Sequence, residues 1–115
     1  MDRIAEIKAE FLKVSREAGQ AFLDMHYQGQ DRGLCGFAWV NIYPKYKGNT
    51  KEGRAERDTL RALGFELNWT GKVFEFWNPS SLPVQNVDAK EAGARAGADY
   101  LRGLGFNAIP GSRLD

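Results

Sequence analysis

Two near-identical hexapeptides constrain the fold of this chain more than any other feature. Residues 60–65 read LRALGF and residues 101–106 read LRGLGF. In each copy a helical pattern runs into Leu-Gly-Phe, and Gly64 and Gly105 occupy the position where a helix C-terminus favours a left-handed residue. A strand pattern follows each copy. The sequence therefore predicts one helix–strand unit that occurs twice.

The segments before the two hexapeptides also correspond. The apolar stretch 36–43 predicts a strand, then a loop, a helix from about Thr50 and a strand over 65–70. After a tight turn at Thr70-Gly71, residues 72–77 predict a strand, and Asp88 opens the last helix with Glu91 at capping-box spacing. With right-handed crossovers, two strand–helix–strand units form a ferredoxin-like βαββαβ sandwich. We expect this α+β fold over residues 35–110, within a single domain spanning 1–115.

Residues 1–27 predict an additional N-terminal amphipathic helix. Its apolar residues recur every three or four positions, at Ile4, Ile7, Phe11, Val14, Ala18, Ala21 and Met25. About three heptads are the lower limit for a coiled coil, so two interpretations stay open: packing on its own domain, or a homodimer. Gly93 and Gly97 lower the helix propensity of the last helix, which predicts a face that packs closely against a neighbour.

Composition narrows the classes of function. The chain has 16 basic and 15 acidic side chains, so no global field attracts it to nucleic acid. It has no apolar run of membrane length and no signal-peptide core, so we expect a cytoplasmic protein without a membrane partner. His26 and Cys35 are the only histidine and cysteine. They are too few for a zinc site, and the sequence shows neither that they are adjacent in space nor that a third group orients them as a Cys–His nucleophile, so we predict no enzyme, metal or cofactor.

Alternation along the expected strands gives the sheet two different faces. The uniformly apolar face, expected under the two crossover helices, comprises Ala38, Val40, Ile42, Phe65, Leu67, Trp69, Phe74 and Phe76. The other face carries Phe37, Trp39, Asn41, Tyr43 and Trp77. Either the N-terminal helix lies across this aromatic face and buries it, or the face is a stacking platform for a ligand.

A basic segment follows the first expected strand. It contains Lys45, Lys47, Lys51, Arg54 and Arg57. Asn49 or Thr50 is the expected N-cap of the next helix, whose N-terminus favours an anion; the alternative is an ordinary solvated loop. Arg113 either reaches back to such an anion, pairs with Asp115 or frays. The predicted ligand site comprises Phe37, Trp39, Asn41, Tyr43, Lys45, Lys47, Lys51, Arg54, Trp77 and Arg113.

Two resemblances bear on this site. GFAWVNI (36–42) resembles the signature of RNA-recognition-motif domains, although Cys35 replaces its leading basic residue, Ile42 replaces its last aromatic residue, and the segment lies on the first strand. The resemblance implies base-stacking roles for Phe37 and Trp39. The frame CGFAWV, WNPS, Gln85, DAKEAGARA and GSRLD is similar to small uncharacterised proteins encoded by phages and prophages. That resemblance implies a context in which accessory proteins bind host factors or signalling molecules.

The aromatic face and the basic segment together predict a binding protein. Its ligand would be a nucleotide or another phosphate-bearing small molecule, and in a phage context it would sequester a host defence signal. One alternative is an interaction protein that dimerises through the N-terminal helix and inhibits a host defence protein. The other is a single-stranded nucleic-acid-binding domain, ranked last because the net charge is close to zero.

Overall fold

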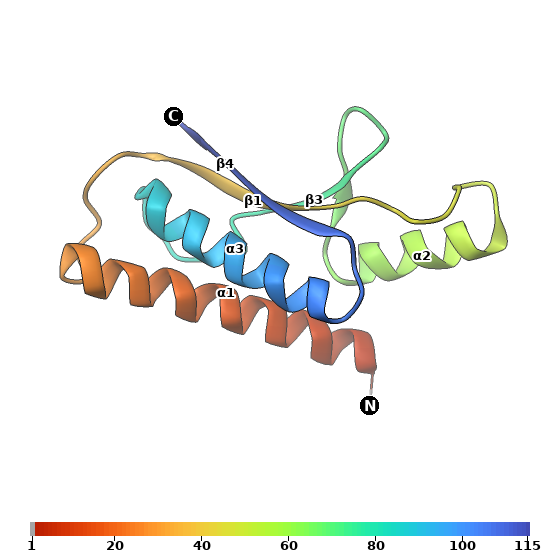
Figure 1. The fold of residues 1–115 in the computed structure, drawn as a ribbon, viewed down its shortest axis with the longest axis horizontal. Helices are drawn as coiled ribbons and strands as arrows, with labels where there is room; N and C mark the ends of the chain where they lie inside the picture. The colour runs from red at the N-terminus through yellow and green to blue at the C-terminus, as the bar shows by residue number, and fades with distance from the viewer. Residues whose placement is uncertain (1) are drawn as a thin grey trace.

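The computed structural model describes residues 2–115 as three helices and four strands (Figure 1). The helices are α1 (Arg3–Tyr27), α2 (Lys51–Ala62) and α3 (Val87–Gly103), and the strands are β1 (Gly36–Ile42), β2 (Glu66–Leu67), β3 (Phe74–Trp77) and β4 (Ala108–Leu114). The strands form one antiparallel sheet in the order β2-β3-β1-β4, so the fold is α+β. Within residues 2–115, no helix combines the length and apolarity that crossing a membrane requires.

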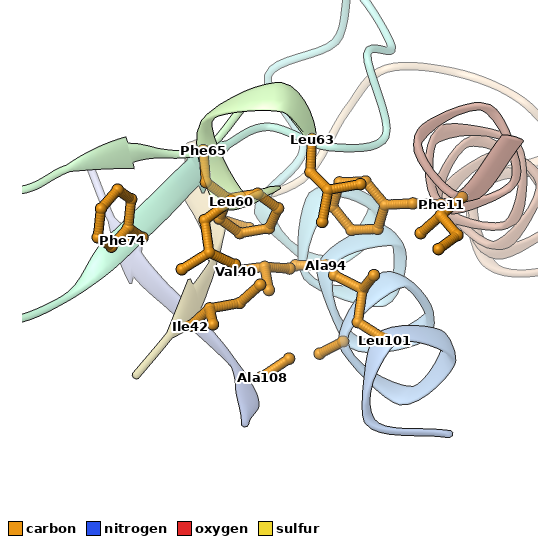
Figure 2. Close-up of a cluster of buried hydrophobic side chains, with 13 residues drawn as sticks. Phe11, Val40, Ile42, Leu60, Leu63, Phe65, Phe74, Ala94, Leu101 and Ala108 are labelled. Atoms are coloured by element: carbon orange, nitrogen blue, oxygen red, sulfur yellow. The ribbon is translucent and has the colours of Figure 1, made fainter. Parts of the chain in front are cut away.

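All three helices pack on the same side of the sheet. Figure 1 shows α3 between the sheet and α1, and Figure 2 shows Phe11 reaching from α1 toward the sheet. The Phe11 ring lies 5.7 Å from that of Phe65 and 5.2 Å from that of Phe76. The shared core comprises Ile7, Phe11, Ala38, Val40, Ile42, Leu60, Leu63, Phe65, Phe74, Ala94, Ala98, Leu101 and Ala108. The N-terminal helix therefore does not bury the aromatic face, and the interpretation that placed it there is wrong.

The two hexapeptides end their helices in the same way. Gly64 and Gly105 both have φ of 99°, which confirms the left-handed glycine predicted at each helix end. The Phe65 amide donates to the Leu60 carbonyl at 3.0 Å, and the Phe106 amide donates to the Leu101 carbonyl at 3.1 Å. These bonds satisfy carbonyls that a helix end otherwise leaves free. The repeated sequence therefore reverses the chain identically before β2 and before β4.

The N-cap residue of α2 agrees with the prediction from the sequence, whereas the N-cap residue of α3 differs from it. Thr50 caps α2, with the Gly53 amide donating to its Oγ1 at 3.0 Å. The prediction that Asp88 opens the last helix is wrong, because Asn86 is the cap and receives the Ala89 amide at 2.8 Å. Asp88 instead accepts a hydrogen bond from the Tyr27 hydroxyl at 3.1 Å, which ties α3 to the end of α1.

The buried face of α1 differs from the predicted seam. The seam is correct at Ile7 and Phe11, but burial then continues every fourth residue, and the full set is Ile7, Phe11, Ser15, Gly19 and Leu23. Met25, a predicted seam residue, is 75% exposed. The reason is close packing on α3: a Cβ added to Gly93 would lie 2.8 Å from the Ser15 carbonyl oxygen. The close-packing glycine face of α3 is confirmed, and α1 is its neighbour.

The strand expected over 65–70 is shortened by its turn. Asn68 Oδ1 accepts hydrogen bonds from the Thr70 amide at 3.1 Å and from the Thr70 hydroxyl at 2.6 Å, and Gly71 has φ of 76°. This local bonding ends β2 at Leu67. The tight turn at Thr70-Gly71 is confirmed. Trp69 is 94% exposed, so its assignment to the face under the helices is wrong.

The last strand continues past the boundary expected at residue 110. β4 pairs with β1 from Ala108 through Leu114, and the Asp115 amide donates to the Cys35 carbonyl at 3.1 Å. Arg113 is therefore held in a strand and does not fray. Pro110 pairs with Val40 at a position between ladder hydrogen bonds, so its missing N–H faces the free edge of β4 and weakens no strand pairing.

Candidate functional site

The second face of the sheet carries no helix among residues 2–115, and aromatic side chains gather on it. Trp39 and Trp77 are register partners on β1 and β3. Their ring centroids lie 4.8 Å apart with an interplanar angle of 33°. The Phe37 ring meets the Trp77 ring edge-on at 6.1 Å. The structure thus brings together three of the predicted aromatic residues, on the face that alternation had assigned to them.

Gly111 provides the space that the Trp39 ring occupies. It is the register partner of Trp39 on β4. A Cβ added to Gly111 would lie 2.6 Å from Trp39 Cε2, which is closer than non-bonded atoms approach. The indole therefore lies over a stretch of β4 backbone that has no side chain.

A shallow pocket of about 310 Å³ lies on this open face. Its lining residues are Trp39, Asn41, Asn68, Trp69, Glu75, Trp77 and Arg113. The volume is at the lower end of the range typical of small-molecule sites. The chain has three tryptophans, and all three line this one pocket. We call this set of residues the tryptophan pocket.

Three lining residues were missing from the predicted site: Asn68, Trp69 and Glu75. Alternation already placed Glu75 on the same face as Trp77, so that signal could have identified it. Asn68 and Trp69 reach the pocket because the turn begins early. The Asn-x-Thr-Gly sequence of that turn was the available signal for Trp69.

The tryptophan pocket carries hydrogen-bond acceptors at one end and a positive charge at the other. Asn41 on β1 and Glu75 on β3 are register partners at one end, and Glu66 on β2, outside the lining, is the next partner of Glu75. Arg113 lies at the other end, opposite Phe37, with its guanidinium carbon 5.4 Å from the Phe37 ring centroid. The pocket therefore has an acceptor end and a cationic end, with the paired indoles between them.

The basic segment forms a separate, internally bonded loop. Glu56 accepts hydrogen bonds from the Lys45 amide at 2.7 Å and from the Tyr46 amide at 3.0 Å. Arg57 lies 3.8 Å from the same carboxylate and donates to the Tyr46 carbonyl at 2.9 Å. The chain's own carboxylate thus occupies two amide donors of this loop.

The four basic residues predicted for the site lie outside the tryptophan pocket. Lys45 Nζ donates to the Gly105 carbonyl, and Arg54 donates to the Asn49 carbonyl at 3.2 Å. Neither these two nor Lys47 and Lys51 lines the pocket. Tyr43 is exposed and also lies outside the lining. Of the ten predicted residues, the structure gathers Phe37, Trp39, Asn41, Trp77 and Arg113.

A second hollow of about 310 Å³ lies between α1 and α3. Phe22 is its single aromatic lining residue, and Asp88, Glu91 and Asp99 line the rest with Arg95 and two alanines. Arg95 pairs with Glu91 at 2.8 Å within α3. This hollow offers one ring and mainly acidic groups, so it suits the predicted phosphate-bearing ligand less well than the tryptophan pocket does.

Comparisons with protein-family models, with curated proteins and with solved structures found no match for this chain. The fold and the site together define an α+β protein with one open, tryptophan-rich face of its sheet.

Proposed function

We propose that this chain is a binding protein that holds a nucleotide, or a similar small molecule with a flat ring and an anionic group, in the tryptophan pocket. The observation that carries the proposal is the convergence of all three tryptophans on one pocket of an uncovered sheet face. Contiguous exposed apolar surface of this kind marks binding sites more often than it marks ordinary surface.

Stacking would supply most of the affinity. A base laid on an aromatic side chain gains about 1–3 kcal/mol, and the gain depends little on which base it is. Arg113 would meet the anionic group, since a guanidinium pairs with a phosphate through two parallel hydrogen bonds. The sequence offered both the basic loop and Arg113 as anion ligands, and the proposal keeps Arg113 alone in that role.

The finer description of the fold belongs to the same proposal. The strand order β2-β3-β1-β4, with a helix between β1 and β2 and another between β3 and β4, supports a ferredoxin-like sandwich with α1 added on the helical side. Sequestration of a host defence signal by a phage protein is a further extension. It is supported by the resemblance of the CGFAWV and GSRLD frame to phage and prophage proteins.

The two alternative functions rank behind this one. An open aromatic face also suits single-stranded nucleic acid, but Glu66 and Glu75 on that face would repel a phosphate backbone. Dimerisation through α1 would need its apolar face, and Ile7, Phe11 and Leu23 on that face are buried within the chain.

Replacing Trp39 with Ala tests the proposed function. We expect nucleoside monophosphates to quench the tryptophan fluorescence of the wild type saturably. Trp39→Ala should bind at least tenfold more weakly, because half of the stacking pair is lost. Its urea midpoint should stay close to that of the wild type, because the removed ring lies outside the core.

The matched control is Tyr46→Ala, which removes an exposed aromatic ring outside the pocket and should leave binding unchanged. If no nucleotide quenches the wild type, the proposed function is wrong. If Trp39→Ala fails to fold, Trp39 is a structural residue and the site is misassigned.

A further inference from the structure

The acceptor end of the tryptophan pocket has features that folding does not explain. The Asn41 Oδ1 atom is buried and has no hydrogen-bond partner among residues 2–115. Its register partner Glu75 lines the same pocket. Glu75 is in turn opposite Glu66, and like charges that face each other across a sheet are destabilising. A buried acceptor without a partner also lowers stability. A bound group that donates hydrogen bonds would pair with the Glu75 carboxylate, and with Asn41 Oδ1 once the Asn41 side chain turns toward the pocket.

Among the common bases, guanine presents the donors that these acceptors need. An ionised carboxylate can only accept hydrogen bonds, and it offers two oxygens side by side. Guanine has adjacent donors, the ring N1–H and the exocyclic N2 amino group. Adenine and cytosine each pair one amino group with an acceptor ring nitrogen, and uracil has a single N–H between two carbonyls. Each of these three bases would direct an acceptor at the carboxylate.

The order of groups along the pocket fits a whole guanine nucleotide. The acceptor pair Asn41 and Glu75 lies at one end of the pocket. Two residues along the strands from this pair lie the indoles of Trp39 and Trp77. Two residues further in the same direction, Phe37 on β1 lies opposite Arg113 on β4. Four residues of strand span roughly 13 Å. A ring stacked on the indoles with its donor edge toward Glu75 would direct its phosphate toward Arg113.

We propose that the tryptophan pocket selects guanine nucleotides, with Glu75 and Asn41 accepting from the base and Arg113 meeting the phosphate. This inference depends on the proposed function, because it names the ligand of the same site. Glu75 is the residue that determines specificity. It discriminates because any other base would leave the carboxylate facing an acceptor, and hydrogen bonds to a charged group are stronger than those between neutral groups.

Fluorescence titration with nucleotides tests the selectivity directly. The chain's three tryptophans all line the pocket, so the signal reports on this site. At fixed salt we expect GMP to bind at least tenfold more tightly than AMP, CMP or UMP. IMP, which lacks the N2 amino group, should bind with intermediate affinity.

Two carboxylate variants complete the experiment. Glu75→Gln should weaken GMP binding at least tenfold and leave AMP binding unchanged or tighter. Glu66→Gln removes the neighbouring carboxylate, which does not line the pocket, and should keep the preference for GMP. Equal affinity of the wild type for the four nucleotides would overturn the guanine selectivity while the proposed function stands. Absence of binding by all of them would overturn the proposed function and the selectivity together.

Discussion

Single residues position the site as much as they fill it, and Gly111 is the clearest example. The indole of Trp39 lies where a side chain on Gly111 would project. Any larger residue at position 111 would move the ring away from β4. The stacking geometry of Trp39 and Trp77 therefore depends on a residue that makes no polar contact with a ligand.

Replacing Gly111 with Ala tests this dependence. The new Cβ would lie 2.6 Å from Trp39 Cε2, so we expect the indole to shift, the tryptophan emission maximum to change and nucleotide affinity to fall several-fold. Gly103→Ala adds the same methyl group where no atom lies within 4 Å, and it should change neither signal. An unchanged emission spectrum in Gly111→Ala would show that Trp39 does not need the space above Gly111.

Local signals predicted some of these residues and missed others. Thr50, Gly64 and Gly105 were predictable because caps and left-handed glycines act within a few residues of chain. Gly111 was not, because its importance comes from Trp39 on a paired strand. Glu56 was missed for the same reason: it binds the Lys45 and Tyr46 amides, eleven and ten positions away along the chain. Because these contacts of Glu56 were not foreseen, the lysines of the loop were interpreted as an anion site.

At the scale of elements, the contact of α1 with α3 depends on small residues. Gly97 faces Phe11 and Ser15 of α1, and Gly93 faces the Ser15 backbone. A side chain at either glycine would push the two helices apart. Since α1 also reaches the sheet through Phe11, that separation would disturb the core.

Replacing Gly97 with Ala should therefore destabilise the fold by about 1–3 kcal/mol, as overpacking of a close contact typically does. The loss should appear in urea denaturation although alanine has the higher helix propensity. Gly103→Ala, at the end of the same helix, should leave stability equal or slightly higher. Greater stability in Gly97→Ala would mean that the two helices are not in close contact there.

Periodicity predicted that α1 exists and that Ile7 and Phe11 are buried, but it missed the other residues that α1 buries. The apolar pattern favoured Val14, Ala21 and Met25, whereas the structure buries Ser15 and Gly19. Small residues are buried there because they let the backbones approach, and a hydrophobic pattern gives them no weight. The strand over 65–70 was predicted too long for a related reason, since the side-chain bonds of Asn68 outweighed the strand propensity of Trp69.

At the scale of the whole molecule, one side of the sheet carries the core and the other carries the tryptophan pocket. Phe11 belongs to the first side, where its ring packs against those of Phe65 and Phe76. Trp69 belongs to the second and is almost fully exposed. Stability and binding should therefore respond to different substitutions.

Phe11→Ala and Trp69→Ala test this separation. Phe11→Ala should lower the free energy of unfolding by about 3–5 kcal/mol, the usual loss for a buried phenylalanine. Trp69→Ala should change it by less than about 0.5 kcal/mol, as expected of a surface substitution. Both values come from urea denaturation followed by circular dichroism. Comparable losses in the two variants would contradict the assignment of Trp69 to the surface.

The site itself was predictable in its aromatic part and only partly in its charges. Alternation along β1 and β3 was enough to place Phe37, Trp39 and Trp77 on one face. The sequence assigned the cationic end mainly to the loop after β1, whose lysines are close in sequence, and offered Arg113 as one further ligand. Arg113 takes that place because β4 pairs beside β1, which sets it opposite Phe37, 76 residues earlier in the chain.

The one-sided sheet also affects how such a chain can evolve. Residues that would contact a ligand project away from the buried cluster, so exchanging them leaves the packing of Phe11, Val40 and Leu101 untouched. Drift or selection can then alter specificity one substitution at a time, without compensating changes in the interior. Descendants of one ancestor could share this architecture and recognise unrelated compounds.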